Sequence, residues 1–216
     1  MVTVTIRLFA ILRERAGSSS LQLELPEGAT VATALAALGR EGPLAGVIDR
    51  LSVQMAVNRN YADGDTPLHA SDELALIPPV SGGAGALGEE LQEGRLRRVL
   101  LTAEPLSLDA ATRAVASPGA GALVVFCGMT RDVPALEYEA YAEMAAEQLA
   151  QIGRAAAERH GLEAIAIEHR VGTVALGEPS VIVAASAAHR AEAFAGAREA
   201  IDLVKEKAPI WKRELG

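Results

Sequence analysis

Five glycines within residues 82–95 divide the sequence into two parts, and each part carries its own pattern of strands and helices. Glycine is costly to fix in one conformation, and this stretch offers few core-forming side chains, so its composition is that of a linker. A chain of 216 residues is long enough for two modest domains. We therefore predict a first domain over residues 1–83, a Gly/Ala-rich linker over 84–95 and a second domain over 96–216.

The first domain alternates apolar and polar residues as short strands do, around one longer helix. The strands are expected at 2–9, 21–25, 51–57 and 73–77. Thr30 is a plausible cap for a helix that runs to Leu38. The order strand, strand, helix, strand, strand predicts a small sheet that wraps around a helix, which is an α+β arrangement.

The second domain repeats this mixture of strands and helices at greater length. The strands are expected at 97–102, 121–127, 136–141, 164–167 and 180–186, and the helices at 107–116, 142–159 and 190–206. Pro209 cannot continue a helix, so the last helix should end by about Lys207. This domain is also predicted to be α+β.

Charge and composition exclude several classes of protein. The formal charge of −8 disfavours nucleic acid as a partner, because phosphate backbones require clustered Lys and Arg. No apolar run approaches the roughly 18 residues that cross a membrane, and the first residues lack the pattern of a signal peptide. The single Cys127 excludes an internal disulfide and a Cys-rich metal site. We expect a cytoplasmic protein that binds no membrane and no metal.

Lysine is confined to one short segment of this sequence. Of the 20 basic residues 17 are Arg, and the three lysines, Lys205, Lys207 and Lys212, fall within eight positions near the C-terminus. A desolvated lysine can lose its proton and act as nucleophile or general base, whereas arginine effectively cannot. The clustering favours chemistry at this segment, with chance in an Arg-rich composition as the alternative.

Residues 78–83, Pro-Pro-Val-Ser-Gly-Gly, follow the last strand of the first domain. With Leu8-Phe9-Ala10 and Ala56-Val57-Asn58, they make this domain resemble the small subunit of molybdopterin synthase, a ubiquitin-like sulfur carrier with a β-grasp fold. The resemblance implies that Gly82 and Gly83 form the sulfur-carrying tail. A separate activating enzyme would use ATP to adenylate the last glycine and convert it to a thiocarboxylate. A tail without side chains can thread a narrow channel.

The second domain resembles the large, catalytic subunit of the same enzyme. The matching pieces are residues 126–131 and 136–141, the two His-Arg pairs at 169–170 and 189–190, and Lys205 with residues 208–214. The resemblance implies the α/β hammerhead-type fold of that subunit and a homodimer formed through this domain. It also implies a sulfurtransferase that adds two sulfurs to cyclic pyranopterin monophosphate. No cofactor would stay bound, because the product is itself the pterin of the molybdenum cofactor.

The resemblance makes Lys205 the main catalytic lysine, as general acid/base or in a covalent intermediate, with Lys212 assisting. Their spacing of seven would place both on one face of a continuous helix, but Pro209 interrupts it, so spacing alone does not make them converge. Arg213 and Glu214 would orient these groups or the substrate.

A phosphate site is expected at His189-Arg190, where a strand passes into a helix with free N–H groups. The alternative there is a solvent-exposed Arg and a packed neutral His. His169-Arg170 has no helix start and is interpreted as structural. Arg131 follows a buried strand on a loop that can approach the ligand, or is a surface charge.

Two departures from the family pattern qualify this prediction. Gly83 is joined to Ala84, and a peptide amide cannot be adenylated, so we expect a protease to release the first domain after Gly83. The loop after Arg131 is short and the sequence ends soon after Glu214, whereas many large subunits continue in a tail that helps finish the site. The alternative function is a ubiquitin-like carrier or interaction protein whose second domain is a non-catalytic binding scaffold.

Overall fold

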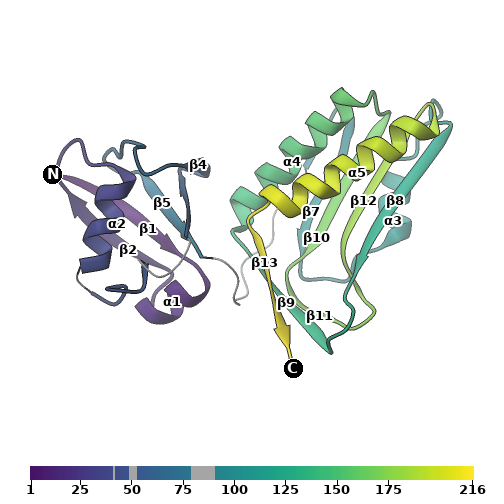
Figure 1. Ribbon diagram of the computed structural model, residues 1–216. Coiled ribbons are helices and arrows are strands. Elements are labelled where there is room, and N and C mark those ends of the chain that lie inside the picture. Colours follow the sequence, from purple (N-terminus) through teal and green to yellow (C-terminus); the bar gives the residue numbers. More distant parts are fainter. Residues whose placement is uncertain (41, 49–52, 79–90) are drawn as a thin grey trace. The chain divides into compact units, whose positions relative to one another are not determined.

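The computed structural model describes residues 1–40, 42–48, 53–78 and 91–216. The chain divides into two units, Met1–Gly83 and Ala84–Gly216, each described separately below. Figure 1 labels their helices and strands. The predicted boundary after Gly83, and Gly82 with it, lies outside the described residues.

The first unit is a five-stranded sheet with one main helix. Its elements are β1 (Val2–Leu8), α1 (Ala10–Ala16), β2 (Ser20–Leu25), α2 (Val31–Arg40), β3 (Gln54–Val57), β4 (Asn60–Ala62) and β5 (Glu73–Ile77). The strand order is β2-β1-β5-β3-β4, with β1 parallel to β5 and the other neighbours antiparallel. α2 buries Val31, Ala34 and Leu38 in the core of this unit. This is the predicted β-grasp arrangement.

β4 was not predicted from the sequence. Asn58 and Arg59 both have positive φ, 48° and 68°, and these two left-handed residues form the tight turn that pairs β3 with β4. The strand covers only three residues, so alternation gave no usable signal for it.

The second unit holds a five-stranded and a three-stranded sheet. Its elements are β6 (Leu91–Glu93), β7 (Leu96–Thr102), α3 (Leu108–Ala114), β8 (Ala122–Met129), β9 (Ala135–Ala140), α4 (Ala142–Arg159), β10 (Ala164–Arg170), β11 (Gly172–Ala175), β12 (Pro179–Ala187), α5 (Arg190–Lys207) and β13 (Ile210–Leu215). The large sheet has the order β6-β7-β10-β12-β8 and the small one β11-β9-β13.

Helices cover both faces of the large sheet. α4 and α5 lie side by side across one face, and α3 lies on the other (Figure 1). Alternation along β10 explains this layering. Ile165 and Ile167 pack with the α4 and α5 residues, whereas Ala164 and Ala166 pack with α3.

Two parts of the second unit differ from the prediction. The predicted linker over 84–95 is too long, because β6 pairs antiparallel with β7. The C-terminal segment is a strand that was not predicted. Pro209 follows the end of α5, and β13 then runs antiparallel to β9, with Lys212 opposite Tyr138. β11, also not predicted, pairs with the other edge of β9.

Gly121, directly before β8, is a position where a substitution measures how tightly the second unit is packed. A Cβ atom at this position would lie 2.3 Å from the carbonyl oxygen of Ala188, and backbone cannot move aside cheaply. We expect Gly121→Ala to lower the free energy of unfolding by about 2 kcal/mol, measured by urea denaturation. Gly119→Ala is the control, because its Cβ would meet only the end of the Glu163 side chain. Equal stability of the two variants would contradict this packing.

Candidate active site

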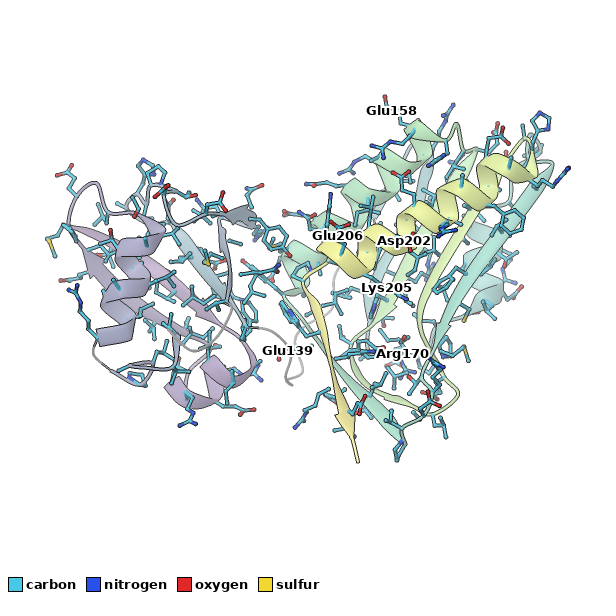
Figure 2. The ribbon with its side chains drawn as sticks, in the orientation of Figure 1. Glu139, Glu158, Arg170, Asp202, Lys205 and Glu206 are labelled. Atoms are coloured by element: carbon cyan, nitrogen blue, oxygen red, sulfur yellow. The ribbon has the colours of Figure 1, made fainter. Side chains whose placement is uncertain are left out.

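A cavity of about 630 Å³ lies in the second unit, between the last turns of α5, the end of β8 and the small sheet. This volume suits a small-molecule ligand. The lining residues are Gly128, Met129, Arg131, Asp132, Val133, Leu136, Tyr138, His169, Ser180, Val181, Ile201, Val204, Lys205, Ile210, Lys212 and Glu214. Figure 2 labels Lys205 on α5 and Arg170 at the end of β10. Both labelled residues lie toward the end of the large sheet from which the small sheet extends.

Both predicted catalytic lysines line this cavity. Lys205 lies in the last turn of α5, and its ammonium nitrogen is 5.6 Å from the centre of the Phe126 ring, within cation–π distance. Lys212 comes from β13. Both lysines line one cavity because β13 pairs antiparallel with β9, so one comes from a helix and the other from a strand.

Arg131 also lines the cavity, on the loop after β8. Two backbone hydrogen bonds hold the start of this loop: the Thr130 N–H donates to the Glu178 carbonyl at 3.0 Å, and the Gly177 N–H donates to the Thr130 carbonyl at 2.9 Å. The Arg131 side chain is 86% exposed and lies 3.5 Å from the Asp132 carboxylate. It therefore has room to meet an anion that enters the cavity.

Alternation along β13 separates the remaining C-terminal residues. Lys212 and Glu214 line the cavity and stand two residues apart, on the same face of the strand. Arg213 lies between them, projects to the opposite face and does not line the cavity. The strand therefore gives Arg213 no direct contact with this cavity, and the orienting role that the resemblance implies for it stays a prediction.

His189 and Arg190 do not line this cavity either. His189 is the N-cap of α5 and Arg190 its first residue, and both are exposed. Fifteen residues of α-helix separate Arg190 from Lys205, a distance of about 23 Å along the axis. Within one chain, the predicted phosphate site and the lysines are therefore at opposite ends of α5.

Two further residues of the cavity are not among the predicted site residues. Tyr138 on β9 and His169 on β10 both line the cavity, and their rings meet edge to face with centroids 5.1 Å apart. His169 had been interpreted as structural together with Arg170. Arg170 fits that interpretation, because its guanidinium pairs with Glu178 at 2.7 Å and donates to the Thr173 carbonyl at 3.2 Å. Only the three-dimensional arrangement shows that His169 faces the cavity.

Among the described residues, no cluster of three or more His, Cys, Asp or Glu side chains is arranged to hold a metal ion. Cys127 lies in β8 with its sulfur 3.4 Å from the Met129 sulfur, and burial raises the pKa of its thiol. This favours packing over reactivity for that cysteine.

None of the helices in the described residues is long and apolar enough to span a bilayer.

The fold and the cavity define a two-part protein: a ubiquitin-like β-grasp unit followed by an α+β unit with a cationic pocket. Residues 6–83 match the ThiS family, and residues 101–207 match the family described as MoaE protein.

Relatives with assigned names agree with these family matches. The molybdopterin synthase catalytic subunit 1 of Mycobacterium tuberculosis is 42% identical over 130 residues, which is 57% of this chain and 88% of the relative. The human molybdopterin synthase catalytic subunit is 39% identical over 133 residues, 59% of this chain and 71% of the relative. The crystal structure of molybdopterin synthase from Staphylococcus aureus superimposes with a TM-score of 0.52 at 35% identity, covering 53% of this chain and 88% of that one.

Through its second unit, the chain belongs to the molybdopterin synthase catalytic subunit family, and a sulfur-carrier unit of the ThiS family is fused ahead of it. This is a family of enzymes in molybdenum cofactor biosynthesis. The predicted fold class and the predicted fusion are confirmed.

Proposed function

We propose that the second unit transfers sulfur to cyclic pyranopterin monophosphate and so makes molybdopterin, with the sulfur carried as a thiocarboxylate on Gly83. The observation that carries this proposal is that Lys205 and Lys212 line the same cavity. A sequence that uses arginine for every other cation has two of its three lysines there.

The cavity offers the groups that this chemistry requires. The thiocarboxylate sulfur attacks an electrophilic carbon of the substrate and displaces an oxygen substituent, which takes up a proton as it leaves. Water then hydrolyses the acyl–sulfur bond, so that the sulfur stays on the substrate and the carrier is released with a free Gly83 carboxylate. Lys205 supplies and removes protons at the reacting carbon or binds it covalently, and Lys212 assists. Arg131 offers a planar set of donors to the substrate phosphate. Glu214, two residues after Lys212, orients the lysines.

Sulfur loading requires a free C-terminal carboxylate on Gly83. In the intact chain this carbonyl belongs to the peptide bond with Ala84, so we propose that a protease cleaves there. An adenylating and sulfurating enzyme then acts on the released Gly82–Gly83 tail, at the expense of ATP.

A homodimer formed through the second unit brings the predicted phosphate site of one chain to the cavity of the other. His189 and Arg190 cannot reach the cavity of their own chain, but a two-fold related copy can bring its own pair to it. Phe194 lies one turn after Arg190 on the same helix face and is 62% exposed, as expected for a residue that a partner covers. In this arrangement each pocket uses lysines from one chain and the phosphate-binding pair from the other.

Sulfur delivery tests the proposed function directly. We expect the intact chain to convert no cyclic pyranopterin monophosphate. Addition of a separate 1–83 segment with a Gly83 thiocarboxylate should give molybdopterin, detected by mass spectrometry, with two carriers consumed per product. The same segment with an ordinary carboxylate is the control. Failure of the thiocarboxylate to support conversion would contradict the proposed function, and turnover by an uncleaved, sulfur-loaded chain would contradict the proposed cleavage.

A further inference from the structure

His169 is a buried side chain in the cavity to which the proposed chemistry gives no role. It lies near the end of β10, is only 7% exposed and lines the same cavity as Lys205. The edge-to-face contact with Tyr138, at an interplanar angle of 71°, fixes the plane of the imidazole ring. A side chain held so firmly can act as a precise recognition group.

The hydrogen bonds of His169 determine which of its nitrogens carries the proton. Nδ1 lies 2.7 Å from the carbonyl oxygen of Arg170, and because a carbonyl only accepts, Nδ1 must carry the proton and donate. Burial lowers the pKa of His169 to about 4, so the ring is neutral near pH 7. Nε2 is therefore unprotonated and is an acceptor.

The other polar side chains of the cavity differ from this neutral acceptor. Arg131, Lys205 and Lys212 offer N–H donors and no acceptor while they are charged. The Ser180 hydroxyl donates to the Gly128 carbonyl at 3.2 Å and, like the Tyr138 hydroxyl, is a group that can both donate and accept. The carboxylates of Asp132 and Glu214 line the cavity too, but both residues are exposed. His169 offers a buried, uncharged acceptor.

We propose that Nε2 of His169 accepts a hydrogen bond from an N–H group of the pterin ring and positions the substrate against Lys205. This inference rests on the proposed function and deepens it. Arg131 binds the phosphate, and His169 binds the neutral heterocycle. A pterin presents N–H donors in the plane of its ring, so a fixed acceptor selects both its orientation and its identity.

Two substitutions separate this role from a purely structural one. In His169→Asn the side-chain amide can keep the hydrogen bond to the Arg170 carbonyl but leaves no acceptor at the position of Nε2. In His169→Gln the longer side chain brings an amide oxygen near that position. We expect His169→Asn to weaken binding of cyclic pyranopterin monophosphate to the full chain about tenfold, measured by isothermal titration calorimetry. His169→Gln should stay within about threefold of the wild type.

His69→Asn is the matched control, because this exposed histidine belongs to the first unit. It should bind like the wild type. Wild-type affinity in His169→Asn would overturn the proposal, and so would equal losses of affinity in both His169 variants together with equal falls in Tm, which would indicate a structural role alone. A wild-type chain that binds no pterin at all would refute the proposed function as well, whereas an unaffected His169→Asn beside an inactive Lys205 variant would refute only the role of His169.

Discussion

Replacement of Lys205 by arginine is expected to lower the turnover of cyclic pyranopterin monophosphate about a thousandfold. Arginine keeps the positive charge at the last turn of α5, so binding of an anionic substrate should change little. It cannot lose its proton at accessible pH and so cannot act as a base or form a covalent adduct. The measurement is single-turnover conversion with a carrier that bears the Gly83 thiocarboxylate, together with the substrate Kd.

Lys207→Arg is the matched control for this variant. Lys207 lies two residues further along α5 and does not line the cavity, so its activity should equal that of the wild type. Lys212→Arg should fall between the two, since Lys212 is assigned an assisting role. Full activity of Lys205→Arg would contradict the lysine mechanism and favour the alternative of a binding scaffold.

Local sequence patterns were sufficient to predict most of the fold. The boundaries of α4, Ala142–Arg159, are those expected from its periodicity, and β5 at Glu73–Ile77 was also placed correctly. The predicted helix start at residue 107 is also correct within one residue, since the Ser107 hydroxyl caps α3 by accepting from the N–H of Ala110 at 3.2 Å. β11 and β13 were missed because they exist through pairing with β9, and their own residues alternate weakly.

The candidate site was predictable only in part, because its geometry also depends on strand pairing that local sequence patterns do not show. The confinement of lysine to one segment predicted a chemical role for Lys205 and Lys212. Their spacing across Pro209 did not predict where the two side chains lie relative to each other. The return of β13 along β9 brings them together, and this pairing also directs Arg213 away from the cavity. His169 was missed because a histidine in a buried strand looks like packing until the surrounding loops are placed.

Mixing two inactive variants provides the sharpest test of the proposed shared pocket. Lys205→Ala and Arg190→Ala should each be inactive alone. After subunit exchange at equal amounts, half of the dimers contain one copy of each. Each mixed dimer then has one pocket with both an intact Lys205 and an intact Arg190. We therefore expect about a quarter of wild-type activity to return, measured as the initial rate of conversion against time of mixing.

Lys205→Ala mixed with Lys212→Ala is the control that makes this result specific. Both lysines line the cavity of a single chain, so every pocket in that mixture lacks one of them, and no activity should return. Recovery in the first mixture without recovery in the second would mean that the phosphate-binding pair acts across the dimer. An inactive first mixture, with exchange verified by mass, would contradict the shared pocket. It would leave Arg131 as the cation that holds the phosphate, since that residue reaches the cavity without a second chain.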